Sequence, residues 1–189
     1  MIRPLLWGIA GLLLGLVIHL VIILILPYFA SDNVWGQVQK LEALGEAVVI
    51  QQPQPGAPNP LGLDPEMAYA VCQFDLSRGP GAFSGELPAD FWSVGIFDRN
   101  GISVYSTTNR SGVGQSLELG IFNEEQTQLL REQQFEIDEG LLIIAAPQND
   151  VFAVVRLALP FPEMRARYEA ALAELSCGHI DTLEVTSDR

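Results

Sequence analysis

Residues 5–26 form an uninterrupted apolar run, LLWGIAGLLLGLVIHLVIILIL, that contains no formally charged side chain. As a helix, these twenty-two residues would reach roughly 33 Å, enough to cross a hydrocarbon core of about 30 Å. A cleavable signal peptide, the alternative, has a shorter apolar region and an Ala-x-Ala-like site, whereas Tyr28 stands where the first small residue would be. The run therefore predicts an uncleaved transmembrane helix over 5–27, after a short N-terminus, 1–4.

The flanks of this run predict its orientation. Arg3 and the amino terminus precede it, whereas Asp32 follows it and Lys40 is the only nearby cation on that side. By the positive-inside tendency, the N-terminus stays in the cytoplasm and the rest of the chain lies outside. We expect a single-pass protein of a bacterial inner membrane with a periplasmic C-terminal domain.

Four residues inside the run share one helical face. Gly8, Gly11, Gly15 and His19 follow one another at steps of three, four and four. Small residues allow helices to pack closely, and an ionisable group at membrane depth needs a partner. We interpret His19 as a neutral imidazole bonded to a neighbouring helix; a haem or chlorophyll-type ligand and a lone histidine near the interface are the alternatives. The first two predict another helix, from an inner-membrane complex or from a second copy.

The chain is strongly acidic, with 23 acidic against 10 basic residues and a formal charge of −13. A nucleic-acid binder needs a basic face, so this class is excluded. Almost all of the charge follows the apolar run. It would suit the steering of basic periplasmic proteins, such as some c-type cytochromes, but solubility alone explains it and is the interpretation we favour.

The remaining sequence predicts an α+β fold: one N-terminal transmembrane helix followed by a mainly antiparallel β domain with flanking helices. A juxtamembrane amphipathic helix is expected over 28–46, capped by Ser31-Asp32. The periplasmic domain, 47–189, begins with a Pro-rich loop, 51–62. Capping and turn signals predict further helices over 64–72, 123–133 and 162–178. Apolar and β-branched runs predict strands over 48–50, 91–97, 102–106, 117–122, 141–146 and 151–159, the last two as a hairpin.

The hairpin over 91–106 is the clearest local signal outside the apolar run. Its first strand, FWSVGIF, leads through Asp-Arg-Asn-Gly to a return strand. The candidate site residues of this hairpin are Phe91, Trp92, Asp98, Gly101 and Tyr105.

The two cysteines, Cys72 and Cys177, predict a structural disulfide, because an exported domain meets an oxidising compartment. Two buried thiols, or a redox or metal role, are the alternatives, and no Cys-x-x-Cys spacing supports the last. His179 lies next to Cys177 and Ser176, but a catalytic triad normally gathers distant segments. We predict no catalytic residues, no metal site and no cofactor beyond the alternative at His19.

The segments HLVIILILPYFASDNVW, DPEMAYAVCQFDLSRGPG and FWSVGIFDRNGISVYSTTNRS together resemble a family of small single-span envelope proteins from alphaproteobacteria. That family carries a domain of unknown function, and larger relatives of the domain class have β-rich, sandwich-like folds. The resemblance implies the anchor, the compartment and the domain type. It brings no catalytic residues.

A second resemblance concerns the hairpin alone. GIFDRNGISVYST is similar to the central hairpin of extracellular PAS-like sensory domains, which lies over a ligand pocket. The leading hypothesis is a non-enzymatic accessory or assembly subunit of an inner-membrane complex. The alternative is a membrane-tethered ligand-binding module, for which we expect an apolar cavity beneath the 91–106 hairpin; an enzyme ranks third.

Overall fold

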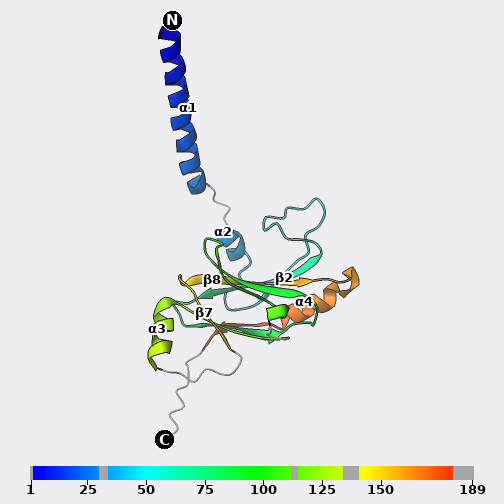
Figure 1. Ribbon diagram of the computed structural model, residues 1–189. Coiled ribbons are helices and arrows are strands. Elements are labelled where there is room, and N and C mark those ends of the chain that lie inside the picture. The colour runs from blue at the N-terminus through cyan, green and yellow to red at the C-terminus, as the bar shows by residue number, and fades with distance from the viewer. Residues whose placement is uncertain (1, 30–33, 112–114, 134–140, 181–189) are drawn as a thin grey trace.

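The computed structural model describes residues 2–29, 34–111, 115–133 and 141–180 of the 189. Its first element, α1 (Ile2–Phe29), projects away from the β domain as a single straight helix (Figure 1). The stretch Ile2–Leu26 has a mean hydropathy of 3.1, and none of it is buried against the rest of the chain. This helix is therefore long and apolar enough to span a membrane.

The described strands form two sheets that pack face to face (Figure 1). Sheet A is wholly antiparallel, with the order β1 (Val48–Ile50), β2 (Met67–Asp75), β8 (Asp150–Ala158), β4 (Trp92–Asp98), β5 (Ser103–Thr108). Sheet B has the order β7 (Leu142–Ala145), β6 (Ser116–Phe122), β3 (Gly81–Glu86), β9 (Ser176–His179). Within sheet B, β6 and β7 are parallel and the other pairs are antiparallel.

The main core lies between the two sheets. Alternate residues of each strand point into it, as expected from the pleat of a strand. Its large, fully buried side chains include Trp92, Tyr168, Phe74, Phe83, Leu117, Leu119 and Leu157. Sheet and helix content together confirm the predicted α+β class.

Three short helices border the sandwich. α2 (Val34–Gln39) lies on the outer face of sheet A, and α4 (Arg165–Ala173) packs against β1 and β2. α3 (Glu124–Gln133) follows β6 and begins with the predicted reciprocal cap: the Asn123 side chain accepts from the Gln126 amide at 2.8 Å, and the Gln126 side chain accepts from the Asn123 amide at 2.9 Å. Single turns of 3₁₀ helix occur at η1 (Asn109–Ser111) and η2 (Pro162–Met164).

The helix predicted over 64–72 is wrong, because these residues lead into the interior strand β2, which lies between β1 and β8. The Asp64 side chain does cap the backbone, since it accepts a hydrogen bond from the Glu66 amide at 2.8 Å. The chain makes a single turn there, however, and no helix follows. Residues 68–74 are buried on both faces of sheet A. Burial on both faces of a sheet outweighs a local capping signal, because tertiary contacts contribute more than propensity.

The predicted hairpin of 141–146 with 151–159 is also wrong. β7 is an edge strand of sheet B, parallel to β6, whereas β8 is the central strand of sheet A. The intervening PQND turn crosses from one sheet to the other. The sequence could not distinguish this crossing from a hairpin, because both use a short polar turn between apolar strands.

Besides β2, two further strands were not predicted. β3 is rich in small residues and lacks the β-branched signal, and β9 occupies the end of the helix expected over 162–178. α4 ends at Ala173, after which the chain pairs with β3 from Ser176 onwards.

The juxtamembrane helix expected over 28–46 is shorter than predicted. α2 ends at Gln39, and its predicted cap, Ser31-Asp32, lies outside the described residues. The chain then turns back to sheet A, where the Ala43 carbonyl accepts from the Gln73 amide at 2.7 Å. These backbone bonds to β2 replace the helical ones that the periodicity predicted.

Candidate functional site

The outer face of sheet A is apolar, although it faces away from the main core. Val71 of β2 and Phe152 of β8 are buried there, beneath Val38 of α2 and Ala43. Strand alternation explains the position, since the neighbouring residues Cys72 and Ala153 point to the opposite face. Sheet A therefore has two apolar faces, and α2 covers only part of the outer one.

An open groove of about 300 Å³ occupies the part of this face that α2 leaves uncovered. Its floor is sheet A, through Ile50, Tyr69, Val71, Phe97, Phe152 and Val154. Its walls are α2, through Val34 and Val38, and the end of the Pro-rich loop, through Leu61, Gly62 and Leu63. Gly101 and Arg156 complete the lining.

Local hydrogen bonds hold the loop wall of the groove in place. The Asn59 side chain accepts from the Leu63 amide at 2.9 Å and donates to its carbonyl at 2.8 Å. The hydroxyl of Tyr69 accepts from the Asp64 amide at 3.0 Å, which ties the end of the loop to β2. The wall is thus formed by bonds inside the chain and needs no ligand to order it.

Aromatic rings stiffen the floor and the α2 side of the groove. Phe97 stacks on Phe152 with ring centroids 5.4 Å apart and an interplanar angle of 22°. Trp35 of α2 lies on the other side of Phe152, with centroids 6.1 Å apart. Such aromatic pairs stabilise packing by about 0.5–1.5 kcal/mol beyond the burial of their surface area. They therefore hold α2 in position on sheet A.

Arg156 is the only charged residue among those that line the groove. It stands on β8, and its Nε donates to the Ser93 hydroxyl at 3.1 Å. Within the described ranges, the ion pairs are Arg99–Asp150 and Arg165–Glu169, so no described carboxylate pairs with Arg156. The groove therefore combines an apolar floor with one unneutralised cation.

The residues of the predicted hairpin separate into different environments. Trp92 is fully buried, Tyr105 packs against the main core, and Phe91 is 42% exposed with the Arg110 guanidinium 5.8 Å from its ring centroid. Asp98 and Gly101 shape the turn, and Gly101 adopts a φ of +77° that favours glycine. Of these five, only Gly101 reaches the groove.

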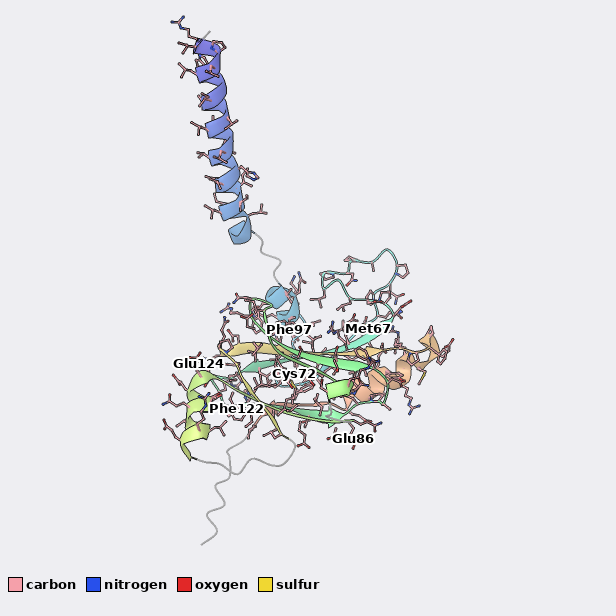
Figure 2. The ribbon with its side chains drawn as sticks, in the orientation of Figure 1. Met67, Cys72, Glu86, Phe97, Phe122 and Glu124 are labelled. Carbon is pink, nitrogen blue, oxygen red and sulfur yellow. A yellow bond between two sulfur atoms is a disulfide. The ribbon has the colours of Figure 1, made fainter. Side chains whose placement is uncertain are left out.

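Beneath the hairpin, where a PAS-like pocket was expected, the described side chains form a solid core. Trp92, Val94 and Ile96 each have 0% exposure and fill the space between the sheets. The groove lies on the opposite face of sheet A. Figure 2 shows Phe97, which lines it, on the side of the sheet that carries α2.

The structure joins Cys72 of β2 to Cys177 of β9 by a disulfide, with the two Cα atoms 6.4 Å apart. The bridge links the two sheets and leaves Cys177 without a thiol for nucleophilic chemistry. Nearby, the His179 ring lies 3.2 Å, through Nδ1, from the Gly79 carbonyl oxygen. Among the described residues, no three His, Cys, Asp or Glu side chains gather in a way that could hold a metal ion.

The Gly/His face of α1 meets no other described part of the chain. Space is open around Gly8, Gly11 and Gly15, and His19 lies on the same exposed helix. The contacts of this face are therefore left to groups outside the chain.

The groove itself was not predicted. One signal was present: MAYAVCQF in β2 is an almost continuous apolar run, which is typical of a strand covered on both faces. Because this segment was assigned to a helix, the second apolar face of sheet A went unrecognised.

No protein-family model and no curated protein matches the chain. The crystal structure of the VPA0106 protein from Vibrio parahaemolyticus is similar, with a TM-score of 0.52 at 11% identity over 62% of this chain and 29% of that one. An uncharacterised protein from Burkholderia cenocepacia gives 0.44 at 11% identity over 82% and 42%, too low to carry an argument. The chain thus spans less than half the length of either protein. The first likeness shows a shared fold and nothing about activity.

Proposed function

We propose that this chain is a non-enzymatic, membrane-tethered module that binds an apolar ligand on the outer face of sheet A. The observation that carries the proposal is the groove of about 300 Å³, whose accessible floor includes the partly buried residues Ile50, Phe97 and Val154. Its volume is at the lower end of the range for small-molecule sites, about 300–1,000 Å³. The groove does not lie beneath the 91–106 hairpin, so the proposal keeps the ligand-binding class of the alternative and gives up its PAS-like site.

The proposed location is a bacterial inner membrane, with α1 as an uncleaved anchor and the β domain in the periplasm. Arg3 at the start of α1 supports a cytoplasmic N-terminus. The Cys72–Cys177 bridge supports an exported domain, since disulfides persist in oxidising compartments. Attachment to a membrane would keep the groove close to lipids and to membrane-embedded partners.

A neutral fluorescent probe tests the proposal on the detergent-solubilised full chain. N-phenyl-1-naphthylamine should bind and brighten, and Val154→Asp should weaken its binding about tenfold or more, because a carboxylate on the floor makes the groove polar. The matched control is Ile143→Asp, a half-exposed apolar residue of sheet B outside the groove. Absent binding, or equal binding by both variants, would overturn the proposal.

The unpartnered face of α1 favours a second candidate, the accessory subunit of an inner-membrane complex. Gly8, Gly11 and Gly15 leave room for a close helix, and His19 would donate or accept a hydrogen bond there. A native complex in mild detergent should contain a second membrane protein or a second copy, and His19→Leu with Gly11→Leu should release it. Leu13→Ala is the control. Migration of the native chain alone would exclude this candidate.

A further inference from the structure

The position of the groove relative to α1 limits where its ligand comes from. Sheet A and α2 form the side of the sandwich that is turned toward α1 (Figure 1). Only residues 30–33 separate Phe29, the end of α1, from Val34, which lines the groove. Five Cα-to-Cα steps reach at most about 18 Å. If α1 spans a bilayer, one wall of the groove therefore lies at the level of the lipid head groups or just above it.

The chemistry of the lining selects among possible ligands. Twelve of the thirteen lining residues carry no charge, and the thirteenth is Arg156, whose Nη groups make no hydrogen bond within the described segments. A guanidinium is a planar donor suited to carboxylate and phosphate oxygens. The complementary ligand has an apolar chain and an anionic head.

The charge of the rest of the chain makes this cation selective. At a net −13, the molecule repels soluble anions in general. An anion that arrives by burying an apolar chain beside Arg156 meets no carboxylate in the lining. Burial of the apolar chain and pairing of the anionic head with Arg156 then both favour binding. A small anion lacks the first contribution, and a neutral apolar molecule lacks the second.

We propose that the groove takes up one acyl chain of an anionic phospholipid from the membrane in which α1 is anchored, with the phosphate of its head group on Arg156. This inference rests on the proposed function, because it specifies the ligand of the same groove. The volume of about 300 Å³ is too small for an entire two-chain lipid, so the groove would hold part of one acyl chain.

Photo-crosslinking of the full chain in nanodiscs tests the inference. The discs contain phosphatidylcholine with a trace of either phosphatidylglycerol or phosphatidylcholine that carries a diazirine on one acyl chain. We expect the phosphatidylglycerol probe to label β2 or β8 peptides about five-fold more than the phosphatidylcholine probe. Arg156→Gln should remove this preference and Arg156→Lys should restore part of it. The matched control is Arg99→Gln, an exposed arginine outside the groove whose partner is Asp150.

The outcomes separate this inference from the proposed function. Arg156→Gln should still bind N-phenyl-1-naphthylamine, because the apolar floor is unchanged. Three results would overturn the lipid assignment: equal labelling by both lipid probes, labelling confined to α1, or an unchanged preference in Arg156→Gln. If N-phenyl-1-naphthylamine still binds in that case, the groove remains a ligand-binding site. Failure of the neutral probe to bind the wild-type chain would overturn the proposed function as well.

Discussion

At the scale of single residues, Asp98 shows how one side chain sets a turn beside the groove. Its Oδ1 accepts from the Asn100 amide at 2.8 Å and from the Ile102 amide at 2.9 Å, while its own carbonyl accepts from the Gly101 amide at 2.9 Å. Asp98 is only 4% exposed, and its Oδ2 also accepts from the side chain of Gln148, which precedes β8, at 3.3 Å. The turn therefore holds Gly101 against Val34 of α2, the two being neighbours in the groove lining.

Replacing Asp98 should destabilise the domain more than replacing the arginine next to it. Asp98→Ala removes the acceptor for two amides, and we expect a loss of about 1–2 kcal/mol in the free energy of unfolding by urea. Arg99→Ala breaks only the exposed pair with Asp150, at 3.6 Å, and should cost less than about 1 kcal/mol. Equal losses in the two variants would contradict this role of Asp98.

Tyr168 should make the stability of the domain fall at high pH. Burial, reinforced by the hydrogen bond from its hydroxyl to Asp90, raises the pKa of Tyr168 from 10.0 to about 12. Because the pKa is higher in the folded chain, folding favours the neutral phenol. This contribution is complete below about pH 10 and is lost as the pH rises through about 12. Unfolding titrations across this range should show the fall in the wild type and a smaller one in Tyr168→Phe.

At the scale of elements, the disulfide connects the interior strand β2 of sheet A to the edge strand β9 of sheet B. β9 is four residues long and pairs only with β3. The bridge encloses a sequence separation of 105 residues, so it removes much entropy from the unfolded chain. The bridge should therefore stabilise the packing of sheet B against sheet A.

Removal of the bridge should cost about 3–5 kcal/mol in the free energy of unfolding. The measurement is guanidinium denaturation of the wild type and of the double variant Cys72→Ala, Cys177→Ala, each with and without a reductant. Reductant should destabilise the wild type and leave the double variant unchanged. A wild type that is insensitive to the reductant under unfolding conditions would contradict the structural role.

At the scale of the whole molecule, the β domain has its own core and owes none of it to α1. Residues 2–26 of α1 are all exposed, and the main core is built from the two sheets and α4. A chain starting at Val34 should therefore unfold cooperatively, within a few degrees of the melting temperature of the detergent-solubilised full chain. Calorimetry checks this. A non-cooperative transition in the shortened chain would mean that residues before Val34 stabilise the domain.

The sequence alone predicted the features that depend on neighbours along the chain. The apolar run of α1, the turn at Asp98–Gly101 and the reciprocal cap of Asn123 and Gln126 are each set by residues within a few positions of one another. Such predictions are reliable because the interactions that stabilise these features join residues close together in the sequence. The cysteine pair was predicted only by count and compartment.

Only the tertiary structure decided which sheet each strand joins. β7 and β8 are separated by a short turn, yet they lie in different sheets, and β2 is a strand despite its capping signal. Strand pairing depends on burial of side chains from distant segments, which periodicity does not encode. The same holds for the groove: its apolar residues are visible in the sequence, but their exposure on the outer face of sheet A depends on how far α2 covers them.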